Sequence, residues 1–143
     1  MDRHTKNKEL ISALRLAMYD FSESSVRKVL DGLFISEPVL RLCYPLGDKV
    51  GVDNYYMDVF APLLRALPDL ERRDTIVMAG PTKEGADWVG CCGYYTGTFS
   101  KAWLDIPPTG HQVAMRFHEF YRFEEERVTE VQMGRGERSI CLV

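Results

Sequence analysis

The first part of the chain repeats apolar residues at three- and four-residue steps. Between Lys6 and Phe21 these residues are Leu10, Ile11, Leu14, Ala17, Met18 and Phe21. This spacing is typical of an amphipathic helix. A second helix is predicted next, because Ser24 or Ser25 can cap its start by accepting a backbone N–H bond. Its apolar positions are Val26, Val29, Leu30, Leu33 and Phe34. The pattern therefore predicts a helical hairpin.

A third helix is predicted from Asp53 to Leu67, because Asp is a good cap and apolar residues follow at helical spacing. Those residues are Tyr56, Phe60, Leu63, Leu64 and Leu67. Pro62 lies inside this pattern, and proline removes a backbone donor, so we expect a kink or a fresh helix start there. Before this helix, Glu37 to Pro45 predicts a short strand that ends in a turn.

After Leu70 the periodicity changes to that of strands. Four segments are rich in β-branched and aromatic residues and are separated by Gly and Pro clusters: Thr75 to Ala79, Trp88 to Thr96, Gln112 to Phe123 and Arg127 to Met133. Consecutive strands without crossover helices favour antiparallel pairing, so the chain is expected to be an α+β protein. The segment from Phe99 to His111 contains Trp103, and we expect it to fold back over the molecule because it is too apolar for a solvated loop.

Composition narrows the class of protein. The 143 residues are 45% hydrophobic and 27% charged with a net charge of −3, so we expect one globular domain over residues 1–143. Residues 1–5 and 134–143 are expected to be atypical or disordered. The scattered basic residues argue against nucleic acid as a partner. No apolar run approaches the roughly 18 residues of a membrane span, so a cytoplasmic location without membrane contact is expected.

Cysteine and histidine usage favours neither a metal site nor a disulfide. The four cysteines lack a paired C-x-x-C spacing, and the three histidines form no recognisable ligand cluster. We interpret the thiols as reduced and predict no metal.

The densest group of chemically useful residues lies on the long predicted strand, from Arg116 to Arg122. Alternation places Arg116, His118 and Arg122 on one face. It places Glu119 and Tyr121 on the other face, and only one of these faces can line a pocket. His118 or Glu119 could abstract a proton from an activated carbon. On the residues alone, however, surface or cross-strand pairing is the favoured interpretation of both.

Two further groups have two interpretations each. The aromatic residues Tyr55, Tyr56, Phe60, Trp88, Tyr94 and Tyr95 could form the flat walls of a ligand pocket, or they could simply pack the core. The run from Glu71 to Asp74 mixes charges, and it could fix the start of a strand with ion pairs. An ordinary solvated turn is the favoured interpretation of that run.

The order of four motifs resembles a known family. They are Leu67-Pro68-Asp69-Leu70, Gly93-Tyr94-Tyr95-Thr96-Gly97, Pro107-Pro108-Thr109-Gly110, and Phe120-Tyr121-Arg122-Phe123 ahead of Val128-Thr129-Glu130. Together they resemble the SnoaL-like polyketide cyclases of the nuclear transport factor 2-like superfamily, from about Lys6 to Gln132. The resemblance implies a curved antiparallel sheet wrapped against the helices as a cone around an apolar pocket, a cystatin-like roll. It also implies a homodimer formed through the outer face of the sheet.

The same resemblance implies cofactor-free acid/base chemistry that closes a ring by aldol condensation. In the cyclases an aspartate soon after the Val-Thr-Glu-like segment acts as the acid/base. This chain has Met133-Gly134-Arg135-Gly136-Glu137-Arg138 there, without an aspartate, and Glu137 is the nearest acid. The proton-transfer residue is therefore replaced by Glu119, His118 or Glu137, or else the pocket only binds.

We expect a cofactor-independent lyase or isomerase that acts on a small hydrophobic carbonyl compound. The alternative is a non-catalytic module of the same fold that binds a hydrophobic ligand or a protein. The catalytic candidates are His118, Glu119 and Glu137. The substrate-binding candidates are Tyr55, Phe60, Trp88, Tyr95, Trp103, Arg116 and Phe120.

Overall fold

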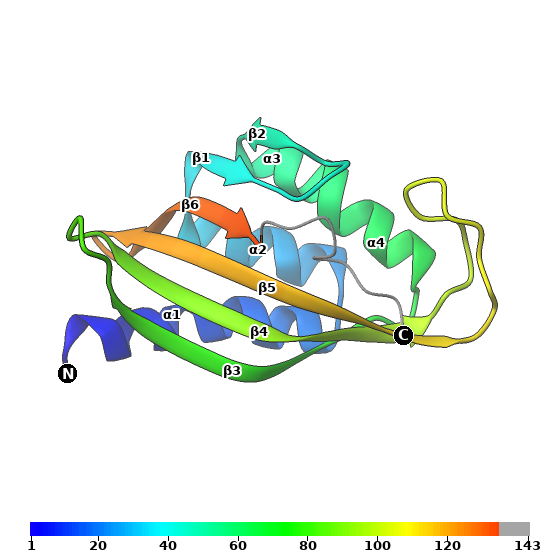
Figure 1. Ribbon diagram of the computed structural model, residues 1–143, viewed down its shortest axis with the longest axis horizontal. Helices are drawn as coiled ribbons and strands as arrows, with labels where there is room; N and C mark the ends of the chain where they lie inside the picture. The colour runs from blue at the N-terminus through cyan, green and yellow to red at the C-terminus, as the bar shows by residue number, and fades with distance from the viewer. Residues whose placement is uncertain (135–143) are drawn as a thin grey trace.

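A computed structural model describes residues 1–134 of the chain. The helical elements are α1 (Arg3–Tyr19), α2 (Glu23–Leu33), α3 (Val52–Tyr55), the π-helical segment η1 (Tyr56–Phe60) and α4 (Ala61–Ala66). The strands are β1 (Phe34–Arg41), β2 (Asp48–Val50), β3 (Glu71–Pro81), β4 (Asp87–Thr98), β5 (Gln112–Glu124) and β6 (Arg127–Met133). The helices pack against one face of a curved sheet, and the connection between β4 and β5 projects beyond the sheet beside α4 (Figure 1).

The predicted helical hairpin is present, and both of its helices start earlier than the sequence pattern predicted. Asp2 caps α1 by accepting bonds from the backbone N–H groups of His4 and Thr5. Ser22 caps α2, because its extended backbone lets the side chain accept from Ser25 N. The cap predicted at Ser24 or Ser25 therefore lies inside the helix.

The sheet is mixed, with the strand order β2-β1-β6-β5-β4-β3. Four of the five contacts between neighbouring strands are antiparallel, as predicted, but β1 pairs parallel with β6. The expectation of purely antiparallel pairing is corrected at this one contact. Parallel pairing needs a long connection between the two strands, and most of the chain separates β1 from β6. Phe34, predicted at the end of the second helix, instead starts β1.

The predicted break at Pro62 coincides with a change of helix type. Ala61 N–H donates to Tyr56 O, which closes the wider π-helical turn, and α4 then begins with proline near its start. Proline is tolerated in a first turn because no donor is needed there. The break brings Phe60 and Leu63 into the core, where both are almost completely buried.

A β-bulge in β3 decides which of its residues face the core. The pairing with β4 shifts between Asp74 and Ile76, so Thr75 is the extra residue. Arg72 and Asp74 point inward before the bulge. After it, Ile76 and Met78 point outward and are more than half exposed. The bulge therefore reverses the alternation of the strand, as bulges do.

The bulge depends on a glycine in the neighbouring strand. A Cβ at Gly93 would overlap the carbonyl oxygen of Arg73, whereas a Cβ at Gly80 would meet nothing within 4 Å. Gly93→Ala is therefore expected to lower the free energy of unfolding by about 1–3 kcal/mol, because the backbone must shift. Gly80→Ala in β3 is the matched control, with an expected change below about 0.5 kcal/mol. Urea unfolding measures both, and equal effects would contradict the close approach at Gly93.

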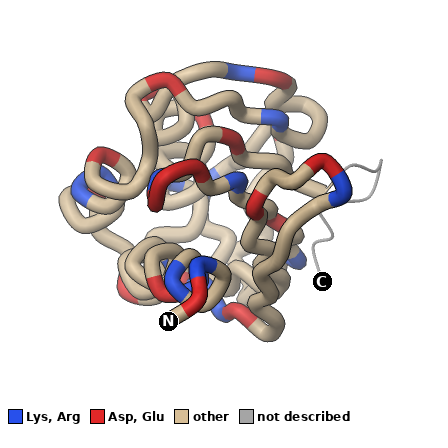
Figure 2. The backbone as a smooth tube through the Cα atoms, turned by 90° about the vertical axis from the view of Figure 1, so that its left-hand side faces the viewer, with Lys and Arg blue, Asp and Glu red and all other residues tan. Residues whose placement is uncertain are grey.

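None of the helices within residues 1–134 combines the length and apolar character that a bilayer crossing requires. Acidic and basic residues are interspersed along the backbone in the view of Figure 2. Many of these charges form surface ion pairs, such as that between Arg27 and Glu23.

Candidate functional site

A network of charged and phenolic side chains lies on the inner face of the sheet, between the sheet and α1. Its centre is Arg72, whose side chain is completely buried. Arg72 Nε donates to Asp74 Oδ1 at 2.9 Å, and Arg72 Nη2 donates to Asp74 Oδ2 at 3.3 Å. Arg72 Nη1 donates to Glu119 Oε2 at 2.9 Å. The guanidinium thus joins two carboxylates, one from its own strand and one from β5.

Glu119 receives hydrogen bonds at both of its oxygens. Tyr95 OH donates to Oε1 at 2.7 Å, and Tyr121 OH donates to Oε2 beside Arg72. Glu119 is only 3% exposed. The carboxylate is therefore held in one orientation by three donors from three strands, at a depth where an unpaired charge would be strongly destabilising.

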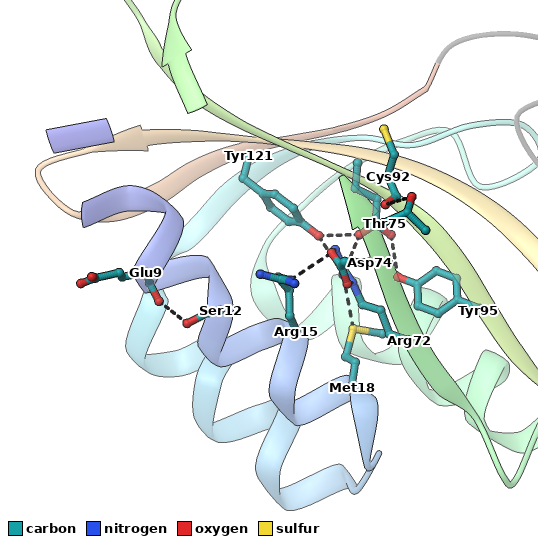
Figure 3. A network of polar contacts seen from close by, with 11 residues as sticks. Glu9, Ser12, Arg15, Met18, Arg72, Asp74, Thr75, Cys92, Tyr95 and Tyr121 are labelled. Atoms are coloured by element: carbon teal, nitrogen blue, oxygen red, sulfur yellow. Dashed lines mark hydrogen bonds and ion pairs between the residues drawn. The ribbon is translucent and has the colours of Figure 1, made fainter. Parts of the chain in front are cut away.

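Helix α1 completes the network from the other side. Arg15 Nε lies 3.2 Å from Asp74 Oδ2, and Arg72 Nη1 also contacts Met18 Sδ at 3.7 Å. Figure 3 shows Arg15 and Met18 pointing from α1 toward Arg72 and Asp74 on β3. Two guanidinium groups thus balance two carboxylates, and this balance allows the group to stay buried.

The environment fixes the protonation of the groups around Glu119. Burial alone would lower the pKa of Arg72, but Tyr121, Glu119, Tyr95 and Asp74 raise it well above its usual value. Burial, reinforced by the charge of Glu119, raises the pKa of Tyr95 well above its usual value. Burial also raises the pKa of Tyr121, against the opposing effect of Arg72. Both phenols therefore remain hydrogen-bond donors at neutral pH.

Tyr55 extends the phenolic group toward the aromatic core. Its ring centroid lies 4.6 Å from that of Phe60 and 5.9 Å from that of Phe34. Burial raises the pKa of Tyr55 well above its usual value. Its hydroxyl forms no hydrogen bond within 3.5 Å among the described residues, although Tyr121 is one of the groups that act on its pKa. A buried hydroxyl without a close partner is uncommon in proteins.

A small cavity borders the network. Its volume is about 40 Å³, and both Glu119 and Tyr95 line it. The other lining residues are Cys43, Leu46, Val59, Phe60, Leu63, Trp103, Met115, Arg116, Phe117, His118, Met133 and Gly134. The wall is therefore mainly apolar, with one carboxylate and one phenol on it. The volume suits about two or three water molecules and is far below the roughly 300 Å³ of a small-ligand pocket.

The connection between β4 and β5 contributes Trp103 to the cavity wall. The segment from Phe99 to His111 thus folds back over the molecule, as the sequence predicted. Trp103 is 7% exposed and forms an isolated β-bridge with Ile106. Ser100 N–H donates to Ala66 O at 2.9 Å, which ties this connection to the end of α4. The cavity is small in this conformation, so a larger molecule requires movement of lining residues such as Trp103.

Residues 15–133 match a protein-family model described as SnoaL-like polyketide cyclase. The chain belongs to the SnoaL-like polyketide cyclase family. Among curated proteins, none matches it.

Solved structures of family members and their neighbours share the fold of this SnoaL-like chain. A candidate SnoaL-like polyketide cyclase from Jannaschia sp. CCS1 has a TM-score of 0.75 at 21% identity, covering 94% of this chain and 90% of that one. Wild-type IdmH, a candidate polyketide cyclase from Streptomyces antibioticus, has a TM-score of 0.72 at 18% identity, covering 94% and 95%. AclR, a candidate hydroxylase from Streptomyces galilaeus, has a TM-score of 0.73 at 20% identity, covering 95% and 78%.

The predicted site residues of this SnoaL-like protein fall into two groups. Glu119, Phe60, Tyr95 and Trp103 line the interior cavity, and Tyr55 lies in the core beside Phe60. Arg116 and His118 also belong to the cavity lining, but their side chains contact Tyr94 and Cys92 on the outer face. Met133 and Gly134, which follow the Val-Thr-Glu segment, also reach the cavity wall. Glu137 lies outside the described residues.

The second group lies on the outer face of the sheet. Trp88 and Phe120 line an open hollow of about 1000 Å³ there. His118 pairs with Cys92 across the strands, with Nδ1 3.2 Å from Cys92 Sγ. The side chains of His118 and Glu119 therefore point to opposite faces, as alternation predicted, and cannot act together on one substrate atom.

The sequence analysis missed Arg72, Asp74 and Tyr121 as members of the site. The run from Glu71 to Asp74 is not the solvated turn that was favoured, because Arg72 and Asp74 are buried and paired. Within this run, Arg73 and Glu71 point outward and form an exposed ion pair. The available signal was the alternation of β3, which places Arg72 and Asp74 on one face.

The buried phenols predict a loss of stability at alkaline pH. Below the usual tyrosine pKa of about 10, Tyr121 is protonated in both states. Above it the unfolded chain loses this proton while the folded chain keeps it, because its pKa is raised. The free energy of unfolding then falls by about 1.4 kcal/mol per pH unit for such a tyrosine. Tyr121→Phe is expected to make this slope shallower by that amount in urea unfolding above pH 10, and identical slopes would contradict the prediction.

Proposed function

We propose that this protein is a cofactor-independent lyase or isomerase that moves a proton on a small hydrophobic carbonyl compound in the interior cavity. The observation that supports it is the position of Glu119 Oε1 and Tyr95 OH together on an apolar wall. A carboxylate and a phenol in a water-poor site are the groups that enolisation needs. Family membership and the candidate cyclases of the same fold support the same class of chemistry.

Glu119 acts in this proposal as the base and then as the acid. Oε1 takes a proton from the carbon next to the substrate carbonyl, and the C–H electron pair forms the enolate. The enolate carbon attacks a second carbonyl of the same molecule, which forms a C–C bond and an alkoxide. The alkoxide then takes the proton back from Glu119, so the carboxylate is regenerated.

Tyr95 supplies the oxyanion contact. Its hydroxyl donates to Glu119 Oε1 in the free protein. When a substrate carbonyl enters, the same hydroxyl can donate to that oxygen instead, which leaves Oε1 available for the C–H proton. Burial keeps the Tyr95 pKa raised, so the phenol stays protonated for this task.

Arg72 and Tyr121 act as positioning residues. They hold Glu119 Oε2, which leaves Oε1 as the oxygen that meets the substrate in this proposal, and Asp74 in turn holds Arg72. Such a supporting shell keeps a catalytic group within the narrow geometry that proton transfer requires. The Trp103 segment must open to admit substrate and close to exclude water.

Proton exchange in D2O tests the proposal. A panel of linear and polycyclic polyketone mimics is incubated with the protein, and NMR follows the loss of the acidic C–H signals. Exchange that exceeds the buffer rate and saturates with ketone is expected. Binding of a ketone with no exchange above the buffer rate would overturn the catalytic proposal.

A non-catalytic binding module is the second candidate. It is favoured by one observation: Glu119 already accepts from three donors, which is also how a purely structural carboxylate is satisfied. Ketone binding without exchange is its expected signature. In that case Glu119 contributes to stability only.

The proposal includes a homodimer formed through the outer face of the sheet. Met78 is 55% exposed and Phe120 is 37% exposed, and with Trp88 they line the open hollow. Exposed apolar surface of this kind favours association. Sedimentation velocity is expected to show a dimer that Trp88→Asp dissociates; a monomer at high concentration would contradict it.

A further inference from the structure

The outer face of the sheet carries a thiol and an imidazole in direct contact. Cys92 on β4 lies opposite His118 on β5 in the strand register, and Cys92 Sγ is 3.2 Å from His118 Nδ1. Figure 3 shows the sulfur of Cys92 pointing away from α1 and the buried network. Neither side chain has a role in the interior chemistry proposed above.

Cys92 differs from the other cysteines within residues 1–134. Cys91 is completely buried, and burial raises its pKa to about 12, so its thiol stays protonated. Cys43 is 8% exposed and contacts Met133 Sδ at 3.9 Å. Cys92 is only partly buried, and a base lies within hydrogen-bond distance of it. A nucleophile with an adjacent base is the arrangement that activates a thiol.

The surroundings of the pair add positive charge and apolar surface. Arg116 lies two residues before His118, on the same face of β5. Its guanidinium lies 5.6 Å from the Tyr94 ring centroid on that face. On the β6 side, a Cβ at Gly134 would come within 3.1 Å of His118 Cβ, so the backbone packs closely on the imidazole. On the β3 side, Ile76 lies opposite Cys92 and is 52% exposed.

Within residues 1–134, the charged and titratable groups near the pair come from three strands. β5 contributes Arg116, and β4 contributes Tyr94, which receives a hydrogen bond from Arg116 at 3.1 Å. β3 contributes Arg73, opposite Tyr94, and Arg73 is paired with Glu71. The carboxylate in this group, Glu71, is thus paired with Arg73 and not with His118.

We propose that Cys92 and His118 form a covalent capture site for apolar α,β-unsaturated carbonyl compounds. His118 Nδ1 takes the thiol proton, and the sulfur attacks the β-carbon of the enone. The C=C electron pair moves to the α-carbon, which takes the proton back from His118, so the product is a thioether with no other reagent consumed. Ile76, with Met78 and Phe120 one row further along, provides the apolar surface that the ligand contacts.

Labelling with N-ethylmaleimide tests this site independently of the interior function. The full chain is treated at a concentration where sedimentation shows single copies, and peptide mass spectrometry gives the rate for each cysteine. Cys92 is expected to react at least about tenfold faster than Cys43 and Cys91, since a proton-accepting neighbour contributes on this order or more. Cys92→Ser identifies the labelled position.

The role of the His118 imidazole is tested by the rate at which Cys92 is labelled. His118→Asn is expected to slow labelling of Cys92 about tenfold at pH 7, and the two rates should converge above the ordinary thiol pKa of about 8.5, where hydroxide takes the proton. His111→Asn, which removes an exposed histidine elsewhere, is the matched control with an unchanged rate. An equal rate in His118→Asn across pH 6–9, or labelling of Cys92 no faster than that of Cys43, would overturn the proposal.

Discussion

Replacing Arg72 with methionine is expected to lower the free energy of unfolding by about 3–5 kcal/mol. The side chain is completely buried and holds both Asp74 and Glu119. Removal of the cation leaves two carboxylates inside the protein with insufficient positive charge, and such uncompensated charges are strongly destabilising. This is a large part of the roughly 5–15 kcal/mol that stabilises a typical domain.

Arg73→Met is the matched control for this prediction. Arg73 is the next residue in β3, but it points outward and pairs with Glu71 at the surface. Exposed ion pairs contribute less than about 1 kcal/mol, so the control should remain close to wild type. Adding Glu119→Gln to Arg72→Met removes one of the uncompensated carboxylates and should recover part of the lost free energy of unfolding. Equal effects of the two arginine variants would contradict a buried, paired Arg72.

Replacing Glu119 with glutamine is expected to lower the rate of ketone proton exchange by about 10²–10⁴-fold, the usual contribution of a general base. Glutamine keeps the size and the acceptor oxygen of Glu119 but cannot take a proton. The variant also leaves Arg72 without one of its anions, so exchange must be measured well below the melting temperature of each protein.

The companion variant is His118→Asn, because the sequence favoured His118 and Glu119 equally. His118 also belongs to the lining of the interior cavity, but its imidazole points to the outer face, where Nδ1 contacts Cys92 Sγ. The proposal therefore predicts an exchange rate near that of wild type. If exchange is lost in His118→Asn and kept in Glu119→Gln, the catalytic site lies on the outer face and the interior assignment is wrong.

The sequence predicted most of the helices and strands and the alternation along β5 correctly, because these depend on local periodicity, but it did not predict β2. β5 pairs with β4 without a bulge, so simple alternation separated Glu119 from His118. The predicted strand that corresponds to β3 began at Thr75, whereas β3 begins at Glu71, so the inward direction of Arg72 and Asp74 was missed. A charged run is also interpreted as solvent-exposed when its ion-pair partners are far away in the sequence. Glu119 is 47 positions from Arg72.

Two features depend on tertiary packing and could not be predicted from local pattern. The parallel contact of β1 with β6 joins strands from opposite ends of the described chain. The position of Trp103 on the cavity wall depends on how its segment docks on α4, through bonds such as that from Ser100 N to Ala66 O. The apolar content of the segment predicted that it folds back, but it gives no information on the volume left beneath the segment.

The most direct test of the account is a crystal structure of the protein with a slowly reacting cyclic 1,3-diketone. The account predicts that the ligand lies in an enlarged interior cavity with Trp103 displaced. Its acidic carbon should lie about 3–3.5 Å from Glu119 Oε1, and its oxygen should accept a hydrogen bond from Tyr95. A ligand bound instead in the outer hollow beside Trp88 and Phe120, with the interior still closed, would contradict the account.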